Sequence, residues 1–157
     1  YFAEHPQAEW LTGYCRNVDG EGRPIRGLIR AYKNFWLSRP SYKVLLVLNY
    51  IAQPATFWRR RVTEAIGPLD ESLNYTMEYQ YWLRIGAEHR LHVLKEDLAA
   101  FRLHNQSKSG NTAHKQFEEE LGVARSFAGP VLLGLHKAHN AVVIGIYKHI
   151  LGLGREE

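Results

Sequence analysis

The residue type and position of Glu78 suggest acid–base chemistry. Glu78 begins the segment 78–88, where Tyr81 and Ile85 continue the helical spacing of the preceding Met77. The helix dipole favours a charged carboxylate in a first turn. Such a group can take the proton from a hydroxyl within hydrogen-bond reach, so Glu78 is a candidate general base. The alternative is a solvent-exposed carboxylate that adds roughly a few tenths of a kcal/mol to helix stability.

His104 is the second candidate, because it opens a polar loop that also contains Ser107 and Lys108. A neutral imidazole suits a divalent transition metal, whereas a protonated one suits phosphate. The alternative is a histidine of an ordinary surface loop. Arg102, Ser107 and Lys108 are of types that contact phosphate, although surface loops carry such residues without binding anything.

Gln53 and Trp82 are candidates for contacts with a substrate. Gln53 either faces a substrate pocket or hydrogen-bonds to backbone at the end of a strand. Trp82 either contacts a substrate or packs in the core, and the core is favoured for an aromatic residue on a helix.

The elements that position these residues alternate between strands and helices. Strands are predicted at 10–15, 92–94 and 98–103, and helices at 26–37, 60–66, 78–88, 115–127 and 131–153. Residues 44–51 form an apolar run that fits a buried strand or a helical turn, and 53–58 should be extended at its start, because it contains Pro54. This mixture predicts an α/β class, or α+β if the chain is one part of a larger domain.

The length, composition and net charge are those of an ordinary globular protein. The chain has 157 residues, of which 45% are hydrophobic and 23% charged, with a net charge of +4. This balance tolerates anionic partners but selects none of them. Cys15 is the only cysteine, which excludes an intrachain disulfide and favours a reducing compartment. No apolar stretch is long enough to span a membrane and the N-terminus lacks the pattern of a signal peptide, so we expect a cytoplasmic location, with or without membrane association.

Two other clusters have simpler interpretations. Residues 59–61 are three consecutive arginines, which we interpret as a solvated face because no nucleic-acid-binding motif accompanies them. His136 and His139 lie about one helical turn apart, but no third ligand is nearby. We interpret both histidines as surface residues, and we expect no nucleic-acid partner.

Four sequence blocks carry a resemblance to a known family. They are Gln53-Pro54-Ala55-Thr56-Phe57, Gly67-Pro68-Leu69-Asp70-Glu71, Glu78-Tyr79-Gln80-Tyr81-Trp82-Leu83-Arg84 and Arg102-Leu103-His104-Asn105-Gln106-Ser107. In this order and spacing they resemble the second half of the GT-A catalytic domain of family 2 glycosyltransferases. Each block alone would be weak, and the match covers roughly residues 5–112.

The resemblance implies an inverting hexosyl transfer from a nucleotide-sugar donor to a glycan or lipid-linked acceptor, as in polysaccharide biosynthesis at the cell envelope. It implies Glu78 as the base, His104 at the metal site, and contacts with substrate from Gln53, Trp82, Arg102, Ser107 and Lys108. It also implies a divalent Mn or Mg ion held mainly by an Asp-x-Asp motif, which this sequence lacks. Residues 1–112 would be the acceptor-side part of the domain and 113–157 a C-terminal helical extension. We therefore expect the 157-residue chain alone to transfer no sugar.

The sequence departs from the family pattern at the base. The family usually has an aspartate here, often after another acid, whereas Met77 precedes Glu78 and Gln80 fills a position that is often acidic. Two alternatives therefore stay open: a non-catalytic basic module that binds nucleic acid or another anionic partner, and a transferase that has lost its activity. The tail from Val131 is rich in apolar residues, so we expect it to pack on the domain, on a second copy, or on a membrane surface.

Overall fold

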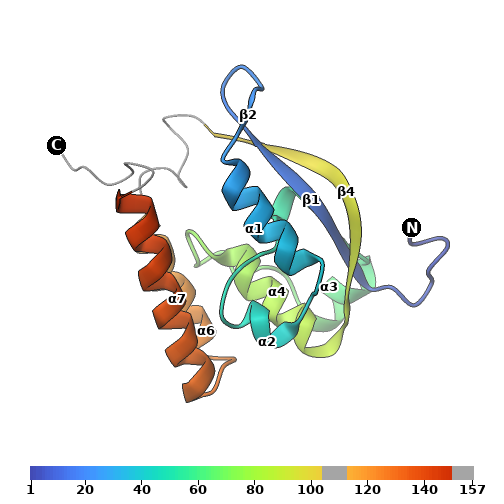
Figure 1. Cartoon of the computed structure of the whole chain (residues 1–157). Helices are drawn as coiled ribbons and strands as arrows, with labels where there is room; N and C mark the ends of the chain where they lie inside the picture. The colour runs from blue at the N-terminus through green and yellow to red at the C-terminus, as the bar shows by residue number, and fades with distance from the viewer. Residues whose placement is uncertain (104–112, 150–157) are drawn as a thin grey trace.

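The computed structural model describes residues 1–103 and 113–149, and it shows a mixed α/β fold (Figure 1). The elements in chain order are β1 (Trp10–Val18), β2 (Pro24–Ile25), α1 (Gly27–Leu37), α2 (Tyr42–Leu45), the 3-10 turn η1 (Gln53–Ala55), β3 (Thr56–Trp58), α3 (Arg60–Ile66), α4 (Met77–Glu88), β4 (Leu91–Arg102), α6 (Ala113–Ala124) and α7 (Pro130–His149). The α/β class predicted from the sequence is confirmed.

Strand β1 is the centre of a four-stranded mixed sheet. It pairs antiparallel with β2 and β3, and parallel with β4 along its whole length. The register between β1 and β4 shifts on either side of Tyr14, so β4 carries extra residues opposite this point. Strands were predicted at 92–94 and 98–103. The structure instead has one strand, and the polar residues between the two predicted pieces form its irregular middle.

Two further predictions about local structure need correction. The apolar run 44–51 forms the end of α2 and then continues without regular structure. Gln53 was expected to be extended, but it begins the 3-10 turn η1, and the extended backbone starts only at Thr56. The predicted bounds of α3 agree with the structure.

The core is one aromatic-rich cluster between the sheet and the helices. Trp82 of α4 stacks on Trp10 of β1 with ring centroids 5.8 Å apart, and Trp58 of β3 packs edge-on against Trp82 at 5.5 Å. Buried residues of α1, α2 and α3 join the same cluster. Burial of such large rings anchors α4 to the sheet.

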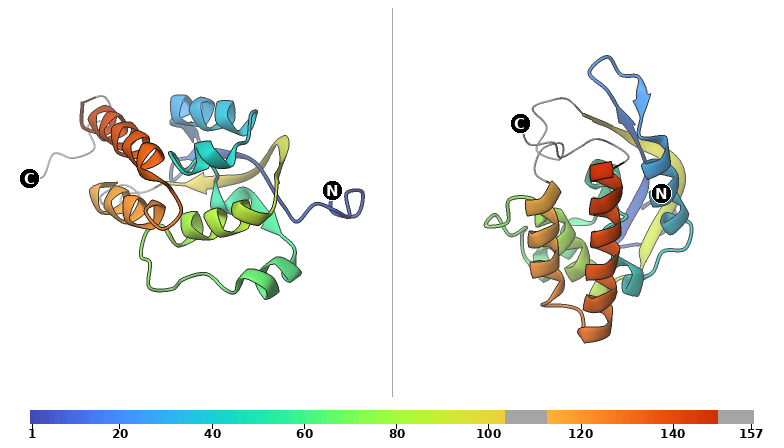
Figure 2. Two further views of the ribbon diagram at one scale, coloured as in Figure 1. Left: turned by 90° about the horizontal axis from the view of Figure 1, so that it is seen from below. Right: turned by 60° about the vertical axis from the view of Figure 1, so that its left-hand side comes forward.

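The C-terminal helices belong to this core. Val123 and Ala124 of α6 are buried in it, and Leu132 and Leu133 of α7 pack against it. Figures 1 and 2 show α6 and α7 beside each other, on the side of the molecule away from the N-terminus. None of the helices in the ranges described is long and apolar enough to cross a bilayer.

Candidate functional site

Glu78 lies in the first turn of α4, and α6 holds the loop before that helix in place. The carboxylate of Glu119 accepts hydrogen bonds from the backbone N–H groups of Asn74 and Tyr75 at 2.8 and 2.6 Å, and from the hydroxyl of Thr76 at 3.1 Å. Thr76 is the N-cap residue of α4. Glu119 therefore fixes the position from which Glu78 projects, and no sequence pattern pointed to it, because 43 residues separate it from Thr76.

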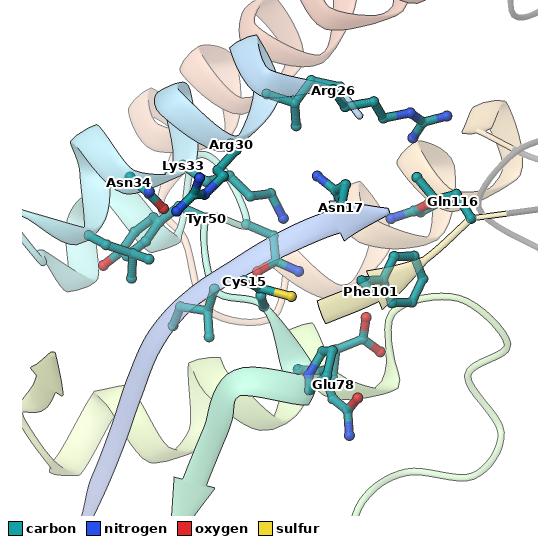
Figure 3. Close-up of a pocket in the computed structure, with 18 of the residues that line it drawn as sticks. Cys15, Asn17, Arg26, Arg30, Lys33, Asn34, Tyr50, Glu78, Phe101 and Gln116 are labelled. Carbon is teal, nitrogen blue, oxygen red and sulfur yellow. The ribbon is translucent and has the colours of Figure 1, made fainter. Parts of the chain in front are cut away.

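A cleft of about 490 Å³ opens beside Glu78 (Figure 3). Its walls come from β1, α1, the segment 49–54, the start of α4, the end of β4 and α6. Arg26, Arg30 and Lys33 of α1 lie along one side of the cleft, and Glu78 lies on the other. The site thus combines one carboxylate with three cationic side chains.

Burial controls the electrostatics of the cleft. It raises the pKa of Glu78, while Lys33 acts in the opposite direction and Glu119 reinforces the increase. Burial likewise lowers the pKa of Lys33, against the effects of Glu120, Cys15 and Glu78. Glu78 therefore holds its proton more tightly than an exposed glutamate does, and the nearby lysine partly compensates its charge.

The structure brings two of the predicted site residues together. Gln53 is exposed and lines the same cleft as Glu78, although the two residues lie on different elements. Leu103, which directly precedes His104, also lines the cleft. His104, Ser107 and Lys108 lie outside the described residues.

Trp82 and Arg102 do not fit their predicted substrate contacts. Trp82 is fully buried between Trp10 and Trp58, so a bound sugar has no access to it, and the alternative of a core residue holds. The guanidinium of Arg102 donates hydrogen bonds to the carbonyl oxygens of Asp19 and Gly20. It braces the turn between β1 and β2 instead of facing the cleft.

The interpretation of the α7 histidines as surface residues is wrong for His136, whereas His139 is half-buried. His136 is fully buried and its Nδ1 atom lies 2.9 Å from the carbonyl oxygen of Leu46. His139 stacks on Tyr32 of α1 and hydrogen-bonds to its hydroxyl at 2.9 Å. The available signal was the four-residue spacing of Leu132, His136 and Asn140, which places His136 on the face of α7 that packs inward.

The arginines at 59–61 are mainly structural. Arg59 donates hydrogen bonds to the carbonyl oxygens of Phe2, His5 and Ala8, and its guanidinium lies over the ring of Phe2. Arg61 pairs with Glu9. These two residues hold the N-terminal segment, and Arg60 is exposed.

Arg84 and Asp70 show how the loop between α3 and α4 is held. Arg84 donates hydrogen bonds to the carbonyl oxygens of Ile66 and Pro68. Asp70 accepts hydrogen bonds from the backbone N–H and the hydroxyl of Ser72, and so braces the loop.

The residues in the described ranges include no group of three or more His, Cys, Asp or Glu side chains that could hold a metal ion. In comparisons with known proteins, the chain matches no protein-family model and no curated protein. The fold and the cleft thus define a mixed α/β protein with a half-buried carboxylate that faces a basic helix.

Proposed function

We propose that this chain forms the acceptor side of a glycosyltransferase active site of the GT-A type, with Glu78 as the general base. The observation that carries the proposal is the position of Glu78: a first-turn carboxylate that lines a 490 Å³ cleft together with Gln53. A cleft of this size suits a sugar.

The arrangement of the four family-like blocks supports the proposal. They fall on η1 and β3, on the loop after α3, on α4, and at the end of β4. Gln53, Leu69, Glu78 and Leu103 each come from a different block, and all four line the cleft. Residues up to 50 positions apart thus meet at one place, as a shared site requires.

The proposed reaction needs a proton acceptor on this side. As the acceptor oxygen bonds to the anomeric carbon of the donor, the bond from that carbon to the leaving diphosphate breaks, and the diphosphate keeps the electron pair. The acceptor O–H proton passes to a carboxylate oxygen of Glu78, and attack from the opposite face inverts the configuration. A carboxylate whose pKa is raised by burial accepts this proton more readily than an exposed one.

The family resemblance implies a divalent Mn or Mg ion, which would stabilise the charge on the leaving diphosphate. The described residues do not supply a set of ligands for such an ion. The chemistry assigned to this chain is therefore limited to positioning the acceptor and taking up its proton.

The decisive variant is Glu78→Gln in the longer protein that the resemblance implies, because glutamine keeps the shape of the side chain but cannot accept the proton. We expect donor binding to persist and turnover to fall by roughly 10²-fold or more. The matched control is Glu88→Gln, an exposed acid in the last turn of the same helix, which should leave turnover unchanged. Full turnover of Glu78→Gln would refute the general-base assignment.

A pH profile tests the same assignment independently. The base works only when ionised, and burial raises the pKa of Glu78. Activity should therefore fall as the pH drops through this raised pKa, above the range in which an exposed glutamate would titrate. A rate that stays constant across that range would speak against Glu78 as the base.

A further inference from the structure

The cationic wall of the cleft is built from one face of α1. Arg26, Arg30 and Lys33 are spaced by four and three residues, which places them on the same side of the helix. All three line the cleft, and Asn34 and Gln116 add amide groups beside them. Figure 3 shows the three cationic side chains directed along one side of the cavity.

The charges on this wall are only partly satisfied. Arg30 donates two hydrogen bonds to the carboxylate of Asp97 at 2.8 and 3.0 Å, but its Nε atom is buried without a partner. Arg26 and Lys33 form no ion pair with the described residues. Burial also lowers the pKa of Lys33, which a bound anion would counteract.

The backbone of Arg26 supports a role for its side chain. Arg26 is the N-cap residue of α1 and adopts a left-handed conformation, with φ 54° and ψ 42°. Among the described residues other than glycine, it is the one with a positive φ. This conformation is unfavourable for a residue with a Cβ atom, and glycine would adopt it freely. An arginine held there keeps a guanidinium at the cleft at a conformational cost.

We propose that the wall formed by Arg26, Arg30 and Lys33 binds an anionic group of the acceptor, a phosphate or a carboxylate, and so presents the neighbouring acceptor hydroxyl to Glu78. The second half of this inference rests on the proposed function, whereas the anion site does not. Guanidinium groups suit both anions because they donate two parallel hydrogen bonds. An anion also offers an acceptor for the orphaned Nε atom of Arg30.

The first experiment measures the affinity of the chain for five probes by NMR titration: inorganic phosphate, a sugar monophosphate, the corresponding uronic acid, the uncharged sugar and a nucleoside diphosphate. We expect both anionic sugars to bind at least about tenfold more tightly than the uncharged sugar, and their ranking separates phosphate from carboxylate. Equal affinity for charged and uncharged sugars would overturn the proposal. Tighter binding of a nucleoside diphosphate than of the sugar monophosphate would assign the wall to the donor, and would also overturn it.

Variants then locate the site. Arg26→Gly removes the guanidinium and relieves the left-handed backbone, so it should fold at least as well and bind the sugar monophosphate about tenfold more weakly. Lys33→Gln should weaken binding similarly. The control is Arg60→Gln, an exposed arginine at the start of α3, which should bind normally. Unchanged binding by Arg26→Gly would refute the site. If Glu78→Gln keeps its turnover while Arg26→Gly loses binding, the general-base proposal fails and the anion site stands.

A second observation concerns the outer surface of α1 and α7, which lie side by side (Figures 1 and 2). Of the ten exposed large apolar side chains in the described ranges, seven lie on these two helices. They are Leu28, Tyr32, Phe35, Val131, Leu135, Val142 and Ile146. Such a concentration in one region is unusual for a surface that faces only water.

The contact between Tyr32 and His139 shows that these side chains form one surface. Leu28 and Phe35 lie four residues before and three after Tyr32, in the same row of α1. Leu135 and Val142 stand in the same relation to His139 on α7. The stacked and hydrogen-bonded pair joins the two rows. We call this surface the α1–α7 face.

Charge identifies the kind of partner that fits this face. Neither α1 nor α7 contains an aspartate or a glutamate, and the guanidinium of Arg39 lies 5.0 Å from the ring centre of Phe35. A second copy would bring two acid-free surfaces together, whereas anionic lipid headgroups complement them. We infer that the α1–α7 face docks on an anionic membrane surface.

Vesicle co-sedimentation tests the docking. The chain should bind vesicles that contain phosphatidylglycerol and bind pure phosphatidylcholine weakly. Leu28→Ser combined with Val142→Ser should reduce binding about tenfold or more, and Arg39→Glu should reduce it on anionic vesicles. Phe57→Ser, which removes an exposed aromatic ring from β3, is the matched control. Absence of vesicle binding would overturn the inference. If the chain also forms a dimer in analytical ultracentrifugation, and the double variant abolishes it, the face is an interface between two copies instead.

Discussion

The contact between His136 and Leu46 fixes the tautomer of the buried histidine. A carbonyl oxygen can only accept, so Nδ1 must carry the hydrogen, and the neutral ring then presents Nε2 as an acceptor. Burial lowers the pKa of His136, which keeps the ring neutral. Its Nε2 atom has no hydrogen-bond partner and lies 3.9 Å from Oε1 of Glu120. A protonated Glu120 therefore suits this acceptor nitrogen better than an ionised Glu120, which has no hydrogen to donate.

Glu120 should make the stability of the protein depend on pH. Burial is the largest cause that raises the pKa of Glu120 to about 7, from 4.5 for a freely exposed glutamate, while Lys33 opposes the increase and nearby Glu78 adds to it. At pH values between these two pKa values, Glu120 thus keeps its proton in the folded state but has lost it in the unfolded state. The free energy of unfolding should fall by about 3 kcal/mol as the pH rises from about 4.5 to about 7.

Glu120→Gln should remove this contribution. Denaturant unfolding of both proteins at several pH values gives the difference, which isolates Glu120 from the buried histidines. The variant should gain stability relative to the parent as the pH rises, whereas Glu64→Gln, an exposed acid on α3, should follow the parent curve. Parallel curves for Glu120→Gln and the parent would mean that Glu120 does not titrate in this window.

The sequence predicted the helices better than the strands, for a physical reason. Helices α1, α3 and α4 have local signals: apolar residues at helical spacing, and the stops at Pro40 and Gly67. The continuity of β4 depends on a partner far away in the sequence. Polar residues 95–97 break its apolar pattern, yet β1 supplies backbone partners on either side of the bulge.

Gly13 should be essential for the pairing of β1 with β4. A Cβ atom added there would lie 2.5 Å from Cγ of Leu98 and 2.9 Å from the carbonyl oxygen of Glu96. Gly13→Ala should therefore destabilise the protein by about 1–3 kcal/mol, measured by thermal or denaturant unfolding. Gly20→Ala is the matched control, because nothing lies within 4 Å of its added Cβ. Equal stability of the two variants would show that the bulge adapts easily.

On the scale of the whole molecule, the sequence predicted some of the residues that line the cleft but not the others. Gln53 and Glu78 could be named from their sequence blocks, whereas Arg26, Arg30 and Lys33 could not, because they belong to none of those blocks. Their shared helix face was visible in the sequence, but a basic helix face is usually solvated. Only the packing of α1 across from the start of α4 turns that face into a wall of the cleft.

The last prediction concerns the whole molecule. The 157-residue chain should bind an anionic sugar but transfer none. In the proposed mechanism Glu78 takes up the proton, and the wall of α1 positions the acceptor. Transfer also needs a bound donor and groups that stabilise the departing diphosphate, and loss of one such group typically costs about 10²–10³ in rate. The resemblance places those groups on an Asp-x-Asp motif that this sequence does not contain. An assay for diphosphate release from nucleotide sugars tests this, run with the chain and, as the positive control, with the longer protein that the resemblance implies. Turnover by the 157-residue chain would show that its own cleft binds the donor. It would refute the proposal that this chain forms only the acceptor side of the site.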